Sequence, residues 1–222
     1  MIGSGSFGHV YNSRNLKTGK EYAMKRFKKK YANKKQAFEE REVKVLNRLR
    51  DIAAQRGEYC PYLIRAEQID CENRKLIIVF EKMEMSLSEF IKKRGRKGLL
   101  KFDELSEIRL IMKQILLGVK FLHDELGIMH RDLKPENIMI NENPLQAKII
   151  DFGTCKDLTM ETGPHTSYVS TRWYWAPECV LRSHHYTFQS DVFALGCVMA
   201  ELYMQRPIFP GHNELDQIDK IF

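Results

Sequence analysis

Five residues spread along the chain have the chemistry that handling a phosphate group would need. They are one lysine early in the sequence and four polar residues in its second half, Lys25, Asp132, Lys134, Asn137 and Asp151. Phosphoryl transfer needs cations that spread the phosphate charge, oxygen atoms that bind a metal ion, and a carboxylate that accepts the proton of the nucleophile. Each residue alone would be interpreted as a solvated surface group, because charged side chains are mostly exposed. Together they meet all three needs, which favours a phosphoryl-transfer site.

A glycine pattern near the N-terminus could also hold phosphates. Gly3, Gly5 and Gly8 have the spacing G-x-G-x-x-G, which dinucleotide-binding folds use between a strand and a helix. In those folds an acidic residue follows about twenty positions later, whereas here a strand pattern follows the glycines and leads to Lys25. We therefore expect a glycine loop that closes over phosphates, because residues without side chains let backbone N–H groups approach the ligand oxygens.

Composition places the chain among ordinary globular proteins. Its 222 residues are 43% hydrophobic and 29% charged, with a formal net charge of +7. Five cysteines without disulfide or metal spacing, and a start that lacks a signal peptide, predict a reducing compartment, the cytoplasm or nucleus. The apolar runs are too short to span a bilayer, so no membrane partner is expected. We interpret the basic run at 25–35 as a solvated face, and expect no nucleic-acid partner.

Hydrophobic periodicity predicts a sheet followed by helices. Alternating residues predict strands at 7–11, 20–27, 63–69 and 75–81, and helical spacing predicts one helix at 34–49. After residue 83 the pattern becomes helical, with helices expected at 86–94, 103–123 and 191–204. The last of these is apolar on most faces, so we expect it inside the core rather than on the surface. The prediction is an α+β fold with a hinge near 82–86 and a cleft between its two parts.

Three motifs follow one another in the second half of the chain: HRDLKPEN at 130–137, DFG at 151–153 and APE at 176–178. With the glycine loop, they resemble the signature of eukaryotic serine/threonine protein kinases over essentially the whole chain. The resemblance implies one bilobal protein kinase domain at 1–222. Its N-lobe at 1–83 would hold a small antiparallel β-sheet with one helix, and its C-lobe at 84–222 would be mainly helical. The chain begins almost inside the glycine loop and stops before the last helices of this family, so we expect it to be truncated at both ends.

The sequence TSY at 166–168 narrows the resemblance to the CMGC group. Together with DFGTCKDL at 151–158 and RPIFPGHNELDQIDKI at 206–221, it is similar to the MAK/MOK-like kinases, related to MAP kinases, and within these most similar to MOK. The likeness implies that an upstream activating kinase phosphorylates Thr166 and Tyr168, and that Arg131 helps bind the phosphate on Thr166. It also implies a monomer that acts on protein substrates in the cytoplasm, nucleus or cilium.

The family implies a role for each candidate catalytic residue. Lys25 would hold the α and β phosphates of ATP and pair with Glu42. Asp132 would orient the acceptor hydroxyl and take its proton, Lys134 would contact the γ-phosphate, and Thr171 would hydrogen-bond this pair. Asn137 and Asp151 would ligate Mg²⁺, a hard cation that prefers oxygen ligands. His130 and Asp191 are expected to be structural.

By the same resemblance, ATP would lie between the lobes with its phosphates under the glycine loop. The adenine would sit between Val10 and Ala23 above and Met139 below, with Phe80 behind it. The backbone of Glu81 and Met83 would hydrogen-bond its edge. The full set expected to bind the nucleotide is Gly3, Gly5, Ser6, Gly8, Val10, Ala23, Lys25, Phe80, Glu81, Met83, Asn137, Met139 and Asp151.

One residue departs from the pattern of the group, and another lacks its usual partner. Trp175 stands where these kinases usually carry an arginine, which predicts a weaker preference for proline after the phosphoacceptor. Glu178 normally pairs with an arginine beyond the end of this chain, so we expect a buried carboxylate without its partner and low stability. A pseudokinase that binds nucleotide without turnover, and a chain too short to fold stably, stay open beside an active kinase.

Overall fold

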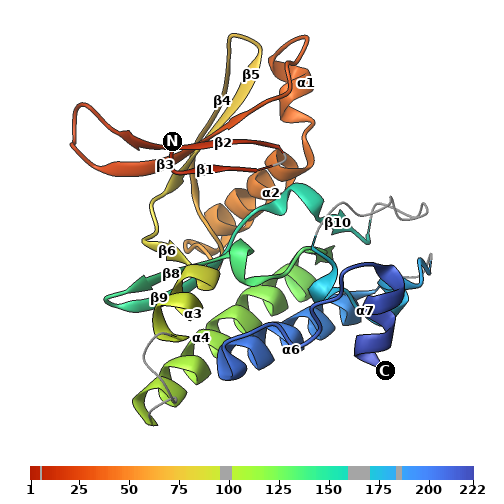
Figure 1. The fold of residues 1–222 in the computed structure, drawn as a ribbon. Helices are drawn as coiled ribbons and strands as arrows, with labels where there is room; N and C mark the ends of the chain where they lie inside the picture. Colours follow the sequence, from red (N-terminus) through yellow and green to blue (C-terminus); the bar gives the residue numbers. More distant parts are fainter. Residues whose placement is uncertain (6, 96–101, 160–170, 184–186) are drawn as a thin grey trace.

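An antiparallel sheet forms one end of the molecule (Figure 1). The computed structural model describes residues 1–222 apart from residue 6 and the segments 96–101, 160–170 and 184–186. The strands lie in the order β1-β2-β3-β5-β4. They are β1 (Gly3–Ser4), β2 (Gly8–Arg14), β3 (Glu21–Phe27), β4 (Ala66–Glu72) and β5 (Lys75–Glu81). All four predicted strands are confirmed. The strand predicted at 75–81 has the bounds of β5, and the ends of the other three differ by up to three residues.

The helix predicted at 34–49 is two helices in the structure. After α1 (Lys34–Phe38), the chain breaks at Glu40, whose φ of −59° and ψ of 139° are not helical, and α2 (Arg41–Arg56) begins. Asn33 caps α1 by accepting a hydrogen bond from the Gln36 N–H at 2.9 Å. The sequence EERE at 39–42 has no apolar residue whose spacing could have revealed the break.

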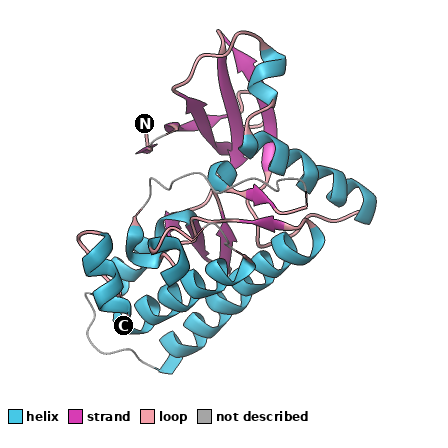
Figure 2. Ribbon diagram, turned by 90° about the vertical axis from the view of Figure 1, so that its right-hand side faces the viewer, coloured by secondary structure: helices cyan, strands magenta, loops and turns pink. Residues whose placement is uncertain are grey.

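Helices form the other end of the molecule (Figure 2). They are α3 (Leu87–Gly95), α4 (Phe102–Lys120), α5 (Pro177–Val180), α6 (Phe188–Met204) and α7 (Glu214–Ile221). A π-helical turn, Phe121–Glu125, continues α4, which confirms the helix predicted at 103–123. The helices predicted at 86–94 and 191–204 are confirmed as α3 and α6.

Short strands lie between the sheet and these helices. One group is β6 (Met85–Ser86), β8 (Ile138–Glu142) and β9 (Leu145–Ile149), which pair in the order β6-β8-β9. The other is a two-stranded ribbon of β7 (Ile128–Met129) and β10 (Lys156–Asp157). The architecture confirms the expected bilobal α+β fold.

One cluster of buried apolar side chains joins the two ends. It runs from the sheet through α2 into the helical part, and its members include Leu46, Ile78, Leu122, Ile138 and Phe152. Burial of this surface is the main favourable contribution to folding. It also holds the sheet and the helices against each other, so residues from both can form one site.

Helix α6 is buried on one side only. Ala194, Leu195 and Val198 are buried, whereas the side chains of Val192 and Met199 are 57% and 45% exposed. The prediction of a helix inside the core is therefore correct for one face and wrong for the other. Within the ranges that the structure describes, no helix combines the length and the apolar character that crossing a membrane requires.

Glu178 is not a buried carboxylate without a partner. Its side chain is half-buried, and one carboxylate oxygen accepts a hydrogen bond from the Ser190 hydroxyl at 2.6 Å. The expectation was wrong because the first turn of α6 brings Ser190 to this carboxylate.

The five cysteines are free thiols, as expected. Cys60 and Cys71 are half-buried, whereas the other three are buried. Burial raises the pKa of Cys179 to about 11 and that of Cys197 to about 12. It raises the pKa of the Cys155 thiol well above its usual range as well.

Candidate active site

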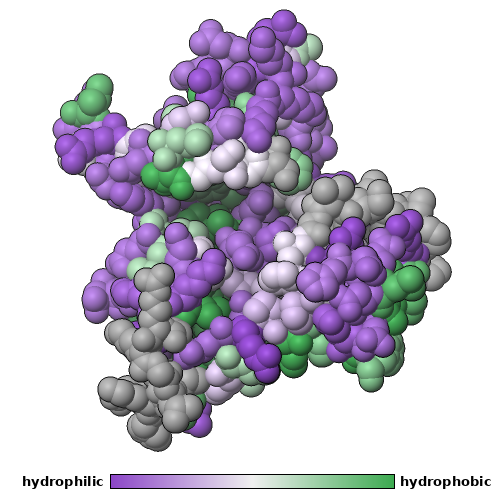
Figure 3. All heavy atoms as spheres, viewed as in Figure 1, coloured by the Kyte–Doolittle hydropathy of each residue, from purple (hydrophilic) through white to green (hydrophobic). Residues whose placement is uncertain are grey.

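The predicted site residues meet where the sheet faces the helical part. Figure 3 shows the surface hollowed between these two parts, with hydrophobic residues inside the recess. Strand β3 and helix α2 supply residues from one side. The loop after β7, the short helix η2 (Pro135–Asn137) and the segment after β9 supply the others. Because α2 packs on the short helix η3 (Phe152–Thr154), the two groups of residues come into contact.

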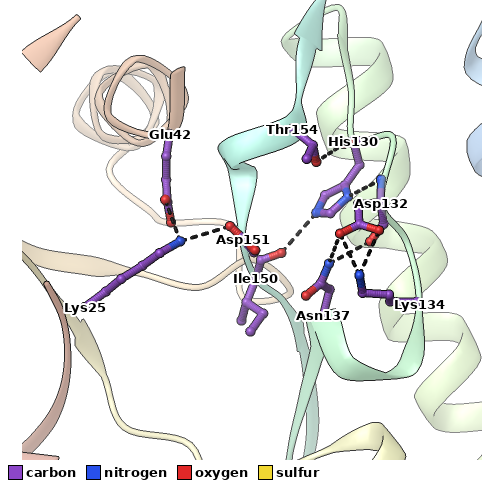
Figure 4. Close-up of polar contacts among 9 residues, drawn as sticks. All are labelled: Lys25, Glu42, His130, Asp132, Lys134, Asn137, Ile150, Asp151 and Thr154. Carbon is purple, nitrogen blue, oxygen red and sulfur yellow. Dashed lines mark hydrogen bonds and ion pairs between the residues drawn. The ribbon is translucent and has the colours of Figure 1, made fainter. Parts of the chain in front are cut away.

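Lys25 joins residues from both sides of the recess. Its ammonium nitrogen Nζ lies 2.7 Å from Glu42 Oε2 and 3.0 Å from Asp151 Oδ1 (Figure 4). The Lys25 and Glu42 side chains are 12% and 3% exposed, so water screens this ion pair little. Burial alone would lower the pKa of Lys25, but the two carboxylates outweigh burial and raise it. Lys25 is therefore a fixed positive charge at the recess.

Three further candidates form a cluster around one carboxylate. Lys134 Nζ lies 3.0 and 2.9 Å from the two carboxylate oxygens of Asp132. The Asn137 amide Nδ2 donates to Asp132 Oδ2 at 2.8 Å and to the Asp132 carbonyl at 2.8 Å. Figure 4 shows these side chains converging on the Asp132 carboxylate. Lys134 and Asn137, which the sequence grouped with Asp132, therefore contact it directly.

The loop that carries this cluster is held from below by Asp191 of α6. Asp191 Oδ2 accepts from the His130 N–H and Oδ1 from the Arg131 N–H, both at 2.8 Å, and His123 Nε2 lies 2.8 Å from Oδ2. Arg131 has a φ of 73°, a left-handed conformation that costs a non-glycine residue about 1–2 kcal/mol. His130 is fully buried, and its Nε2 lies 3.0 Å from the Ile150 carbonyl oxygen. The predicted structural roles of His130 and Asp191 agree with these contacts.

Asn137 and Asp151 are the residues that could hold a metal ion. The N–H of Ile150, the residue before Asp151, donates to the Asn137 carbonyl at 3.0 Å, and this bond keeps Asn137 and Asp151 close. In Figure 4 the amide oxygen of Asn137 points away from Asp132. Burial alone would raise the pKa of Asp151, but the charge of Lys25 outweighs it and holds the pKa below its usual range. An amide oxygen and an ionised carboxylate are ligands of the kind that Mg²⁺ takes, so these residues fit that ion.

The glycine loop is a hairpin in which Gly8 cannot be replaced without a shift. A Cβ at Gly8 would lie 2.6 Å from the Arg26 carbonyl oxygen, whereas a Cβ at Gly5 would meet nothing within 4 Å. Lys28 Nζ donates to the Gly5 carbonyl at 2.7 Å, and so ties the loop to the end of β3. The sequence did not predict this contact, because Lys28 belongs to the basic run interpreted as a solvated face. Ser6 lies outside the described residues.

The residues predicted above the adenine come from adjacent strands. Gly3 pairs with Val10, Val10 with Lys25, and Ala23 with Phe80. Ala23 and Lys25 lie two positions apart on β3, so their side chains share a face of the sheet. Phe80, which was predicted to lie behind the adenine, belongs to the buried core and is 9% exposed.

A largely buried ion pair that the sequence did not reveal lies directly before the predicted hinge, at the end of β5. Lys148 Nζ lies 2.6 Å from Glu81 Oε1, and the Arg65 N–H donates to the same oxygen at 2.9 Å. Lys148 lies in β9 and is 7% exposed, although a lysine in a sequence is normally interpreted as a surface residue. Glu81 therefore connects β5 to β9 of the helical part.

Two further residues predicted at the adenine are described: Met83 is buried, and Met139 in β8 is half-buried.

Thr171 lies on the rim of the Asp132 cluster. It is exposed, and it lines a small pocket together with Asp132 and Trp175. The Arg172 guanidinium lies 5.9 Å from the centroid of the Trp175 ring, within the range of a cation–π contact. The hydrogen bond expected of Thr171 stays a prediction.

The predicted phosphosites cannot be placed in the same way. Thr166 and Tyr168 lie outside the described residues. Arg131, the predicted partner of a phosphate on Thr166, is described and is 9% exposed.

One family model matches the chain along its whole length. The model of the protein kinase domain covers residues 1–222. The serine/threonine-protein kinase MAK of Homo sapiens is 41% identical over 221 residues, which are 100% of this chain and 33% of that protein. The serine/threonine-protein kinase ICK of Rattus norvegicus is 40% identical over 221 residues, 100% of this chain and 32% of that protein.

A third relative tests the finer resemblance. The MAPK/MAK/MRK overlapping kinase of Mus musculus is 38% identical over 224 residues, 99% of this chain and 49% of that protein. The predicted likeness to the MAK/MOK-like serine/threonine kinases is confirmed. This mouse kinase, MOK, is no more identical to the chain than MAK is, so the expected greater similarity to MOK is not supported. The chain spans between about a third and a half of the length of these relatives.

Proposed function

Since the chain belongs to the protein kinase family, we propose that it transfers the γ-phosphoryl group of Mg-ATP to serine or threonine hydroxyls of other proteins. One observation carries the proposal. The Lys25–Glu42 pair and the Asp132–Lys134–Asn137 cluster approach the same recess from opposite sides, and Asp151 contacts Lys25 between them.

The upper residues are suited to binding the nucleotide. We place the α and β phosphates at Lys25, whose positive charge is stabilised by the carboxylates of Glu42 and Asp151. The glycine loop would cover the phosphates, since Gly5 leaves open space for a ligand to approach its backbone. The adenine would lie under Val10 and Ala23, beside Phe80 and the chain from Glu81 to Met83.

The lower residues are suited to the transfer itself. Asp132 would accept the hydroxyl proton as the acceptor oxygen bonds to the γ-phosphorus and the bond from that phosphorus to the leaving oxygen breaks. Lys134 would balance the charge of the transferred group. Asn137 and Asp151 would hold Mg²⁺, which when bound supplies positive charge that stabilises the leaving phosphate. The contacts among these side chains fix their positions before substrate binds, which lowers the entropic cost of alignment.

Two observations weigh against the alternatives left open by the sequence. Every polar residue that the chemistry requires is present and in contact with another member of the set, which argues for turnover rather than nucleotide binding alone. Glu178 is half-buried and accepts a hydrogen bond from Ser190, which weakens the argument for an unstable chain, while the stability itself stays a prediction.

We also propose how the activity is controlled and where it acts. Phosphorylation of Thr166 and Tyr168 by an upstream kinase would raise the activity, with Arg131 as a candidate partner for the phosphate on Thr166. The protein would act as a monomer in the cytoplasm, nucleus or cilium. The T-x-Y spacing supports the phosphorylation part of this proposal.

Phosphoryl transfer from labelled ATP to a serine- and threonine-containing peptide mixture tests the function. Asp132→Asn should keep affinity for Mg-ATP and lose turnover by about 10²-fold or more, because the carboxylate acts on the acceptor. Asp51→Asn, at an exposed carboxylate of α2, is the matched control and should behave like the natural chain. Equal turnover in the Asp132 and Asp51 variants would contradict the assignment. Binding without turnover in the natural chain would indicate the pseudokinase instead.

A further inference from the structure

One arginine of α2 contacts strand β10 and the segment that leads into strand β7. Arg48 Nη2 donates to the Leu126 carbonyl at 2.7 Å, and the other terminal nitrogen, Nη1, pairs with the Asp157 carboxylate. Leu126 comes shortly before β7, and Asp157 ends β10, where it pairs with Ile128. A guanidinium group donates from a rigid planar fork, so this single side chain can hold both segments at once.

The helix and the ribbon both lead to the candidate active site. Strand β7 runs directly into His130 and the loop of Asp132, and Asp151 precedes β10 by a few residues. Glu42 lies six residues before Arg48 on the same helix, which places it about 9 Å away along the axis. A continuous helix therefore connects the Arg48 contacts to the Lys25–Glu42 pair.

Asp157 is oriented for this contact by its own neighbours. Its Oδ1 accepts from the Thr159 N–H at 2.9 Å and from the Thr159 hydroxyl at 2.5 Å, which leaves Oδ2 to Arg48. The Arg48 and Asp157 side chains are 37% and 19% exposed.

Another arginine of α2 offers a comparison. Arg56 and Glu125 form a pair at 2.5 Å, with side chains 47% and 40% exposed. Exposed ion pairs contribute little, because water screens them and both side chains lose freedom. Arg48 differs from Arg56 because it is less exposed, bonds a backbone carbonyl and touches the ribbon that leads to the active site.

We propose that Arg48 is a positioning residue, which holds α2 against the ribbon so that Glu42 keeps Lys25 where the phosphates of ATP bind. This proposal rests on the proposed kinase activity. Without the Arg48 contacts α2 can turn or move away from the ribbon, and Glu42 then leaves Lys25. The effect falls on the nucleotide side of the reaction, because Arg48 contacts none of the residues assigned to the acceptor hydroxyl.

Arg48→Met tests the proposal, since it keeps an unbranched side chain and removes both contacts. We expect kcat/KM for ATP to fall at least about tenfold, as loss of a charge-assisted hydrogen bond would predict. KM for the peptide should stay within about twofold, and so should all parameters of the matched control Arg56→Met. Asp157→Asn, which removes only one contact, should lower kcat/KM for ATP in the same direction. Arg48→Lys keeps the charge without the fork and should recover part of the loss.

A combination with Glu42→Gln separates positioning from a merely structural role. If Arg48 acts through Glu42, adding Arg48→Met to Glu42→Gln lowers kcat/KM no further, although it still lowers stability in urea. Additive losses in the double variant would overturn the proposal, as would unchanged kcat/KM in both Arg48→Met and Asp157→Asn. A natural chain without transfer activity would refute the proposed function instead. The same variants would then be compared by their affinity for a fluorescent ATP analogue with Mg²⁺, and equal affinities would overturn the role of Arg48.

Discussion

Replacing Asp191 by asparagine should destabilise the protein more than any comparable change on its surface. Asp191 is 1% exposed, and its carboxylate accepts from the backbone N–H groups of His130 and Arg131, both at 2.8 Å. It also pairs with His123. Asparagine keeps the size of the side chain, but one of its two polar atoms becomes a donor. Whichever oxygen is replaced, a buried backbone N–H then faces another N–H.

The structure gives the size of this effect. Leaving one buried donor unsatisfied costs about 1–3 kcal/mol, and the remaining bonds lose the strengthening that a charged acceptor gives. We expect Asp191→Asn to lower the free energy of unfolding by about 3 kcal/mol. Where the amide nitrogen takes the place of Oδ1, the left-handed Arg131 adds to the effect, because the bond that holds its unfavourable conformation is then lost.

Urea unfolding followed by far-UV circular dichroism measures this loss. With a slope of about 2 kcal/mol per molar urea, the midpoint should fall by about 1.5 M. Asp51→Asn, an exposed aspartate with the same change of charge, is the matched control and should stay within about 0.5 kcal/mol. If Asp191→Asn also stayed within that limit, the three contacts would not hold the loop, and the explanation given for the conformation of Arg131 would be refuted.

Three further outcomes can be stated from the same contacts. Gly8→Ala should lower the free energy of unfolding by about 1–3 kcal/mol, because the new Cβ would lie 2.6 Å from the Arg26 carbonyl oxygen of β3. Gly5→Ala serves as the control in the same urea titration, because a Cβ there meets nothing within 4 Å. Asp151 has a lowered pKa in the folded state, so it contributes stability above its unfolded pKa that is lost as pH falls through the folded value. Asp151→Asn should therefore reduce the loss of stability between neutral and acid pH, and an unchanged pH profile would contradict this. Trp175→Arg should strengthen selection of proline after the phosphoacceptor on a peptide array. An indole has one hydrogen-bond donor and no charge, whereas a guanidinium group has five donors and a positive charge. Equal selectivity in the two proteins would show that other residues shape the pocket for the residue after the phosphoacceptor.

Local patterns in the sequence predicted much of the fold. Strand alternation located the four longer strands, because one face of the sheet is buried and the other faces solvent. The ordered motifs predicted the cluster around Asp132, since Lys134 and Asn137 are close to it in sequence as well as in space. The break at Glu40 and the exposed face of α6 were missed, because periodicity reports which residues are apolar and not what covers them.

Contacts between distant residues could not be predicted in this way. Arg48 and Asp157 are 109 positions apart, and Glu81 and Lys148 are 67 apart. From the sequence, Arg48, Asp157 and Lys148 would be interpreted as solvated charges. Glu81 was expected only to bind the nucleotide, and the folded chain alone brings each of the four to its partner. The role of Asp191 was expected from the family resemblance, but its three hydrogen bonds and the left-handed Arg131 came from the structure.

The buried thiols allow motions of the active site to be separated from unfolding of the helical part. A cysteine reacts with alkylating reagents as the thiolate, so burial slows the reaction both by excluding the reagent and by raising the pKa. Labelling of a buried thiol therefore requires an opening, and its rate reports the free energy of that opening. Cys155 is 1% exposed and lies just beyond Phe152 and Gly153, whereas Cys197 is 4% exposed in the middle of α6. Mass spectrometry of the two labelling rates would thus follow each region in the same unmodified molecule, without an attached probe.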